Sequence, residues 1–315
     1  MMRPRLTAAL QRLGHTAALK DGAVQLSGFE LEWLEVSPII QAFRRMVRGL
    51  EFDISEMALT TYLTARAFHK PFTALPVFLV RGFHHGAILH NTKLGIESPK
   101  DLEGRRVGVS RGYTVTTGVW VRGILQHEYG VDLDKITWVL SGDEHVAEFR
   151  PPANVKSLEP GKALDTALIS GDLAAAIGIK VEHPDIAPLI PDAAAHAYRR
   201  LASDSYYPIN HLVVVKDAVL EKYPQVAVEL FEAFGAAKRQ YLDRLRQGLI
   251  AEPTAADRMY ARVLATTGAD PLPFGLEANR AMLETLMGYA REQRILPHSC
   301  AVEEVFAPQT TRLTA

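Results

Sequence analysis

Residues 105–125 read RRVGVSRGYTVTTGVWVRGIL, which is a short apolar run, a polar loop and then a helix-like stretch. The run at 105–109 predicts a buried strand, and the threonine-rich segment 114–117 leads into the predicted helix. A strand that passes through a loop directly into a helix is the repeating unit of α/β proteins. This stretch therefore predicts an α/β fold with mostly parallel strands.

The same alternation extends to both sides of this stretch. Helical spacing of Ile39, Phe43, Met46 and Val47 predicts a helix between two strand candidates. The segment after residue 215 reads as mostly helical, and we interpret its apolar stripes as core. Open α/β sheets bind ligands beyond the carboxyl ends of their strands. Further strands are expected at residues 31–36, 52–54, 74–80, 86–90, 136–140, 174–177 and 212–215.

Length and composition limit the class of protein. A chain of 315 residues predicts two compact units at roughly 100–200 residues per domain. The formal net charge is −1, so we expect no nucleic-acid partner. No run of about 18 apolar residues exists, so we expect no membrane span.

The N-terminus and the single cysteine bear on location. The apolar run at 6–10 is shorter than the roughly 7–15 residues that a secretory signal requires. Cys300 cannot form a disulfide within the chain, and we expect an inert thiol there. The sequence therefore predicts a cytoplasmic protein. It leaves open whether the chain forms a homo-oligomer.

Several segments, taken in order, resemble the 4,5-dihydroxyphthalate decarboxylase family, which is similar in turn to type 2 periplasmic binding proteins. The similarity spans nearly the whole chain, and the order and spacing of the segments make it specific. The segments are FDISEMALTTYL at 52–63, LPVF at 75–78, RGFHH at 81–85, DLEGRRVGV at 101–109, WVRGIL at 120–125, PINH at 208–211, PFGLEANR at 273–280 and EVFAP at 304–308.

The resemblance implies a two-lobed α/β fold of the type 2 periplasmic-binding-protein kind, with a ligand cleft between the lobes. Lobe I would be discontinuous, with residues 1–92 and 204–315, and lobe II would be residues 93–203. The alternation of strands and helices does not by itself show this discontinuity.

The resemblance also implies which residues collect in the cleft. The sequence departs from the family pattern at two sites that could line this cleft. Residues 11–16 read QRLGHT where the family has a Gly-Asp-Tyr-Asp-Arg-like segment, and His84 stands where arginine is frequent. The implied catalytic residues are His85, Glu56 and His211, and the implied substrate-binding residues are Arg81, His84, Ser110, Arg111, Tyr113, Thr114, Thr116, Thr117 and Arg122.

The family's chemistry would be removal of carbon dioxide from a hydroxylated aromatic acid such as 4,5-dihydroxyphthalate. That reaction needs a general acid for the ring carbon and cations for the carboxylates, and in principle no metal or other cofactor. Histidine suits proton transfer because its ordinary pKa is about 6.5. Arginine suits carboxylates because its planar fork binds them bidentately. We therefore expect a small anionic aromatic substrate, no cofactor and no metal.

Roles follow for individual residues, each with a structural alternative. Adjacent strand residues face opposite ways, so only one of His84 and His85 can face the ligand from a regular strand, and we favour His85 because the family match is closer there. Glu56 would act as a base or orient a histidine, unless it is only a carboxylate at a helix N-terminus. Arg81 would otherwise be a surface charge, and His211 a hydrogen-bonded core histidine.

The loop 110–117 offers free backbone N–H groups at a helix start, which suits a carboxylate. The alternative is that Thr114 or Thr116 simply caps its own helix. Arg122 lies within that helix, where solvent exposure is the rival interpretation. The acidic segment 143–145 is interpreted as a solvated loop.

Two other functions remain open from the sequence. One is a non-catalytic binding protein for a small aromatic or carboxylate ligand. The other is a different lyase on the same scaffold, like menaquinone-pathway enzymes that dehydrate or form rings. Phosphate-loop, dinucleotide and zinc-protease motifs are absent from the sequence. The exact substrate, the metal requirement, the identity of the proton-donating histidine and the effect of segment 11–16 on specificity are not fixed by the sequence.

Overall fold

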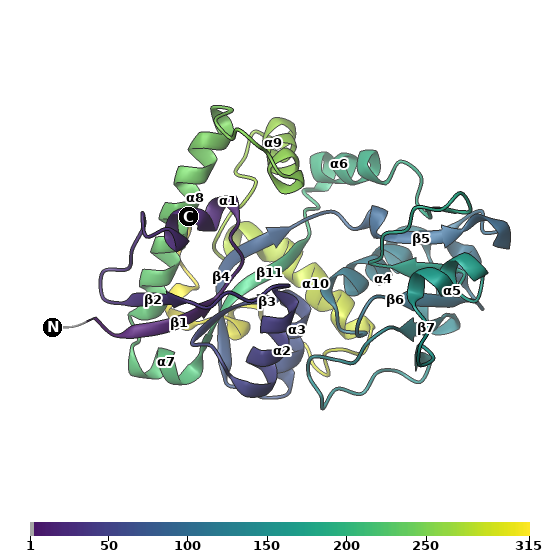
Figure 1. The fold of residues 1–315 in the computed structure, drawn as a ribbon, viewed down its shortest axis with the longest axis horizontal. Helices are drawn as coiled ribbons and strands as arrows, with labels where there is room; N and C mark the ends of the chain where they lie inside the picture. The colour runs from purple at the N-terminus through teal and green to yellow at the C-terminus, as the bar shows by residue number, and fades with distance from the viewer. Residues whose placement is uncertain (1–2) are drawn as a thin grey trace. The chain divides into compact units, whose positions relative to one another are not determined.

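A computed structural model describes residues 3–315, which form two compact units (Figure 1). Unit 1 comprises residues 3–82, 209–284 and 300–315, and unit 2 comprises Phe83–Pro208 and Thr285–Ser299. Unit 2 thus takes in residues 83–92, 204–208 and 285–299, which the sequence-based division placed in lobe I. One reason is that the strand at 88–91 pairs within the sheet of unit 2.

The sheet of unit 1 has the strand order β2-β1-β3-β11-β4. β1 pairs in parallel with β2 and β3, whereas β11 runs antiparallel to both β3 and β4. β11 returns from unit 2 and inserts between two strands of the N-terminal segment, so this sheet is mixed rather than mostly parallel. The strands are β1 (Arg5–Ala9), β2 (Glu30–Trp33), β3 (Ile54–Ala58), β4 (Phe72–Arg81) and β11 (Ile209–Lys216).

One apolar core of unit 1 lies between this sheet and its longest helix, α8. The predicted stripe is confirmed, because Leu230, Phe234 and Ala237 of α8 are buried in one cluster with Val77 of β4 and Val213 of β11. Burying such apolar side chains is the main favourable contribution to folding. The helices of this unit are α1 (Gly14–Lys20), α2 (Ile40–Gly49), α3 (Leu59–Ala67), α7 (Asp217–Lys222), α8 (Val226–Arg246) and α9 (Ala255–Thr267).

The sheet of unit 2 has the order β10-β5-β9-β6-β7-β8. Its centre is parallel, with β6 between β7 and β9, while β5 runs antiparallel to β9 and β10. The strand–loop–helix of residues 105–125 is confirmed as β6 followed by α4. The elements are β5 (Ile88–Asn91), β6 (Arg106–Val109), β7 (Thr137–Leu140), β8 (Val155–Ser157), β9 (Ala175–Ile177), β10 (Ile186–Pro188), α4 (Thr116–Tyr129), α5 (Leu164–Ser170) and α6 (Ala193–Asp204).

Helix α10 (Arg280–Glu292) contributes its C-terminal part to unit 2. Tyr289 of α10 packs edge-on against Trp120 of α4, with ring centroids 5.8 Å apart. Gly123 permits this close approach, because a Cβ there would lie 2.0 Å from the Tyr289 ring. Short 3₁₀ turns complete the fold: η1 (His85–Ala87), η2 (Thr92–Leu94), η3 (Pro99–Leu102), η4 (Leu133–Lys135), η5 (Glu277–Asn279), η6 (Val302–Val305) and η7 (Pro308–Thr310).

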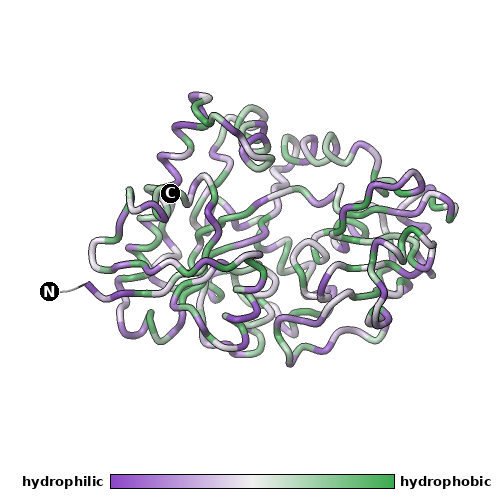
Figure 2. The backbone as a smooth tube through the Cα atoms, viewed as in Figure 1, coloured by the Kyte–Doolittle hydropathy of each residue, from purple (hydrophilic) through white to green (hydrophobic). Residues whose placement is uncertain are grey.

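Hydrophilic and hydrophobic segments alternate along the whole trace (Figure 2). None of the helices formed by residues 3–315 combines the length and the apolar character that crossing a membrane would demand.

Candidate functional site

In unit 1, the Glu56 carboxylate faces the His211 imidazole across neighbouring strands. In the antiparallel register of β3 and β11, His211 lies opposite Ala58 and Val213 lies opposite Glu56. Residues two apart on a strand share a face, so the side chains at 56 and 211 are diagonal neighbours. Glu56 Oε1 lies 2.6 Å from His211 Nδ1. The Glu56 carboxylate and the His211 imidazole are therefore in contact. That Glu56 orients this histidine for catalysis stays a prediction.

Gln11 holds the same carboxylate from the loop after β1. Its backbone N–H donates to Glu56 Oε2 at 3.0 Å, and its side-chain amide donates to Oε1 at 2.8 Å. Burial would raise the pKa of Glu56, yet the hydrogen bonds from His211 and Gln11 outweigh it and hold that pKa below its usual value. The carboxylate therefore stays ionised at neutral pH and fixes the His211 proton on Nδ1.

The His211 ring is further held by Phe43 of α2, which meets it edge-on with centroids 5.0 Å apart. Its side chain is 18% exposed, whereas Glu56 is fully buried. Within residues 3–315, Nδ1 makes the hydrogen bond to Glu56, and Nε2 is the ring nitrogen left for another partner. The pair is thus an oriented imidazole with one accessible nitrogen.

The departing segment 11–16 continues from Gln11 into the core of unit 1. His15 is buried, and its ring packs edge-on against Tyr241 and Tyr260. Burial lowers the pKa of His15 to about 4, so this ring is neutral at pH 7. Gly14 lies against the ring of Tyr241, because a Cβ at position 14 would come within 2.3 Å of that ring. Segment 11–16 therefore ties Glu56 to helices α8 and α9.

Arg81 ends strand β4 and is only 5% exposed, so it is not a surface charge. Its Nη1 donates to Asn279 Oδ1 at 2.9 Å. Asn279 in turn donates to the carbonyls of Pro273 and Gly275, which fixes the amide. Arg81 pairs with Ile209 on β11, two residues before His211. A cation held by Asn279 therefore lies on β4, the strand that neighbours the one bearing the His211 imidazole.

His84 and His85 do not lie on a strand, because β4 ends at Arg81, so strand alternation does not decide their directions. His84 is 4% exposed and stacks near Trp120 at a centroid distance of 6.3 Å. His85 is fully buried, and its Nε2 lies 3.2 and 3.1 Å from the two oxygens of Glu128. His85 therefore faces a carboxylate inside unit 2.

Glu128 of α4 collects two further partners from α6. His196 Nε2 lies 3.0 Å from Oε2, and Arg200 Nη1 donates to Oε1 at 2.5 Å. Burial would raise the pKa of Glu128, but His85, Arg200 and His196 together hold it below its usual value. We call His85, Glu128, His196 and Arg200 the Glu128 cluster. The last three were not predicted from the sequence, where their only signal is the four-residue spacing of His196 and Arg200.

The loop 110–117 already holds a carboxylate of the chain itself. Glu144 accepts from the backbone N–H groups of Tyr113 and Thr114 and from the Thr114 hydroxyl, the last at 2.6 Å. Thr116 is the first residue of α4, with Val115 as its N-cap. The interpretation of 143–145 as a solvated loop is wrong for Glu144 and His145, which are 9% and 6% exposed, whereas Asp143 is exposed.

The other predicted loop residues lie around this carboxylate. Arg111 has a positive φ of 70°, and its N–H donates to the Ser141 hydroxyl at 2.8 Å. Ser110 and Thr117 both flank Gly178. Whether this loop binds a ligand carboxylate stays a prediction, since two of its N–H groups have Glu144 as an acceptor.

Arg122 is fully buried and supports the loop from beneath rather than facing solvent. Its Nη2 donates to the Tyr113 carbonyl at 2.6 Å, and its Nε donates to Gln293 Oε1 at 2.8 Å. The guanidinium lies 3.9 Å from the centre of the Tyr113 ring. Burial lowers the pKa of Arg122.

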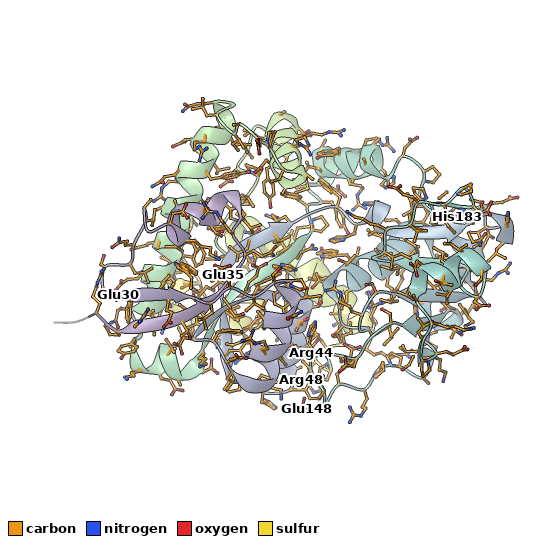
Figure 3. The ribbon with its side chains drawn as sticks, in the orientation of Figure 1. Glu30, Glu35, Arg44, Arg48, Glu148 and His183 are labelled. Atoms are coloured by element: carbon orange, nitrogen blue, oxygen red, sulfur yellow. The ribbon has the colours of Figure 1, made fainter. Side chains whose placement is uncertain are left out.

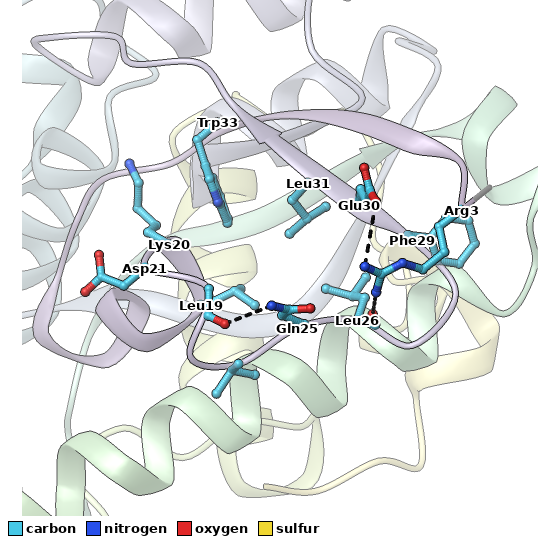
Figure 4. Close-up of a pocket in the computed structure, with 12 residues that line it drawn as sticks. Arg3, Leu19, Lys20, Asp21, Gln25, Leu26, Phe29, Glu30, Leu31 and Trp33 are labelled. Atoms are coloured by element: carbon cyan, nitrogen blue, oxygen red, sulfur yellow. Dashed lines mark hydrogen bonds and ion pairs between the residues drawn. The ribbon is translucent and has the colours of Figure 1, made fainter.

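A pocket of about 360 Å³ opens in unit 1 between α1 and β2 (Figure 4). It contains none of the predicted site residues. Its basic side chains have acidic partners, because Arg3 lies 3.7 Å from Glu30 and Lys20 lies 2.7 Å from Glu35. The pocket therefore offers no uncompensated charge for an anionic ligand.

Comparison with known proteins gives close relatives in sequence. No protein-family model matches the chain. The chain is 31% identical over 262 residues to the 4,5-dihydroxyphthalate decarboxylase of Comamonas testosteroni, and the match covers 78% of each chain. It is 32% identical over 219 residues to the enzyme of the same name from Pseudomonas putida, covering 64% of this chain and 84% of that one.

Among solved structures, the fold is similar to the periplasmic aliphatic sulphonate binding protein SsuA from Escherichia coli. The TM-score is 0.55 at 13% identity, and the match covers 99% of this chain and 100% of that one. Such a likeness confirms the predicted two-lobed α/β fold of the periplasmic-binding-protein kind.

Proposed function

The chain belongs to the 4,5-dihydroxyphthalate decarboxylase family and is a carboxy-lyase, and we propose that its substrate is 4,5-dihydroxyphthalate or a similar hydroxylated aromatic acid. The observation that carries the mechanism is the contact of 2.6 Å between Glu56 and His211 in unit 1. This pair joins two of the three residues that the sequence analysis nominated for proton transfer.

The reaction exchanges a carboxylate for a proton on one ring carbon. A proton adds to the carbon that bears the carboxylate, and a hydroxyl para to that carbon stabilises the protonated ring by becoming ketone-like. The bond between the ring and the carboxylate then breaks, carbon dioxide leaves, and the electron pair of that bond restores the aromatic ring. With 4,5-dihydroxyphthalate the product is 3,4-dihydroxybenzoate.

His211 suits the role of general acid. Its Nδ1 faces the ionised Glu56 carboxylate, which holds the imidazole in place and leaves Nε2–H to donate to the ring carbon. A carboxylate that holds an imidazole in one orientation supports proton transfer in the same way in other enzymes. Gln11 keeps the carboxylate in place by donating to both of its oxygens.

Two other residues have different roles in this proposal. His85 is assigned no proton transfer, because its Nε2 faces Glu128 and its ring is fully buried. Arg81, fixed by Asn279, supplies a cation that orients a substrate carboxylate. His84 and the loop 110–117 add contacts to the substrate, and the buried Arg122 acts through the loop by donating to the Tyr113 carbonyl.

A carbon dioxide release assay on the purified chain tests this function. Substrates are 4,5-dihydroxyphthalate, phthalate without hydroxyls, and dihydroxybenzoates with a single carboxylate, each also measured by thermal shift. Release from 4,5-dihydroxyphthalate and none from phthalate is expected, because phthalate lacks the electron-donating hydroxyl. Thermal shifts without release from any substrate would contradict the catalytic proposal and favour a binding protein.

The cytoplasmic location stays a prediction, and whether the chain forms a homo-oligomer stays open. Cell fractionation with an antibody against the chain checks the first, and light scattering of the purified protein checks the second.

A further inference from the structure

Three potential metal ligands from separate elements converge in unit 2. They are His85 in η1, Glu128 in α4 and His196 in α6. One ligand atom from each lies within 4.8 Å of the others, and among residues 3–315 no other set of three such side chains does so. We propose that these three residues bind one divalent transition-metal ion of the zinc type.

The distances fit such an ion. Glu128 Oε2 lies 3.1 Å from His85 Nε2 and 3.0 Å from His196 Nε2. Ligands about 2.0–2.1 Å from a tetrahedral zinc ion are separated by roughly 3.3 Å. Small side-chain shifts would therefore bring the three atoms to ligand distances without moving the helices.

The donor types also fit. Two neutral imidazoles and one carboxylate are the ligand set of many catalytic zinc sites, in which the fourth position holds water. The His196 side chain is 30% exposed, whereas that of His85 is fully buried and that of Glu128 is 12% exposed. One side of the cluster therefore remains open to a water ligand.

Arg200 compensates the negative charge of Glu128. Its Nη1 donates to Glu128 Oε1, while His85 faces both carboxylate oxygens and His196 faces Oε2. Glu128 then accepts from three groups, and its charge is compensated. Binding of a dication at Oε2 requires both Nε2 atoms to be unprotonated, and the positive charge of Arg200 opposes the ion.

This inference goes beyond the proposed function. None of the three ligands belongs to the Glu56–His211 pair, and no step of the decarboxylation is assigned to the ion. The residues lie 43 and 68 positions apart in sequence, so no local spacing reveals them. The expectation of no metal rested on the chemistry of the decarboxylation and on the absence of such a spacing.

Cobalt(II) provides the direct test, because its visible absorption reports the ligands. Full-length, chelator-treated protein is titrated with Co²⁺, and zinc affinity is measured by competition. We expect one ion per chain. His196→Gln and Glu128→Gln should each weaken binding by more than the roughly 10–100-fold that loss of an outer-shell partner costs. Arg200→Gln should strengthen it, since a nearby positive charge is removed.

His127→Gln is the matched control. His127 is next to Glu128 on α4 and forms its own histidine–carboxylate contact of 2.6 Å with Glu292, but no third potential ligand joins them within the described part of the chain. This variant should bind Co²⁺ like the unmodified chain. His196 is the primary target because it is partly exposed, and circular dichroism verifies that each variant is folded.

Three results would overturn the site. They are no Co²⁺ binding by the unmodified chain, binding that His196→Gln and Glu128→Gln leave unchanged, or equal weakening by His127→Gln. The absorption readout needs no substrate, so it stands whether or not carbon dioxide is released in the assay of function.

Discussion

Each unit contains a carboxylate in contact with at least one imidazole, and the two carboxylates differ in their other hydrogen-bond partners. Glu56 meets one histidine, and its other partner is the neutral Gln11. Glu128 meets two histidines and an arginine. The pKa of each carboxyl is held below its usual value. The same pair of residue types therefore yields a single oriented proton donor in unit 1 and converging ligand atoms in unit 2.

The comparison teaches that partners, rather than residue types, set the chemistry. A carboxylate whose remaining lone pairs are satisfied by an amide keeps one imidazole fixed and leaves its far nitrogen available. A carboxylate shared by several potential cations is neutralised in place. Substitutions in the two units test this difference.

The largest effect is expected from His211→Gln. Loss of the general acid should lower kcat for carbon dioxide release by about 10²–10⁴-fold, with little change in melting temperature because the side chain is partly exposed. His183→Gln is the control, since His183 belongs to the surface of unit 2 (Figure 3), where it lies 3.8 Å from Asp185. Equal activity of His211→Gln and the unmodified chain would remove His211 from the mechanism.

His15→Leu should change the acid stability of unit 1. Burial lowers the pKa of His15 from 6.5 to about 4, so the neutral ring is favoured in the folded state. Its contribution is fully present above pH 6.5 and is lost as the pH falls from 6.5 towards 4. Between pH 7 and pH 5 the unmodified chain should therefore lose about 2 kcal/mol more stability than the variant.

Urea unfolding at the two pH values measures this difference. His90→Leu provides a comparison in unit 2. Burial also lowers the pKa of His90, but this ring is only half-buried, whereas that of His15 is fully buried. An unchanged pH dependence in His15→Leu would show that another group dominates the acid sensitivity.

The smallest effect is expected from Gln11→Ala. Loss of the side-chain amide removes one of the hydrogen bonds that hold the pKa of Glu56 down. One such bond contributes about 1 kcal/mol, so kcat should fall roughly five-fold and the acidic limb of the pH profile should move to higher pH. A lower kcat with an unmoved acidic limb would separate Gln11 from the ionisation of Glu56.

Much of the fold could be predicted because local pattern encodes it. The strand–loop–helix at 105–125 and the apolar stripe of α8 follow from residue periodicity alone. Strands β1, β8 and β10 were missed, since each is short and has no clear alternation. The mixed sheets were also missed, because strand direction depends on how the chain returns from the other unit.

The candidate site, like the fold, could be predicted from the sequence only in part. The residue types, the family and therefore the class of chemistry could be predicted from the sequence, since these depend on order and spacing along the chain. The contact of Glu56 with His211, 155 residues away, and that of His85 with Glu128 emerge only from the folded chain. The physical reason is that strand register and helix packing bring distant side chains within hydrogen-bond distance, and neither is written in the local pattern of hydrophobicity.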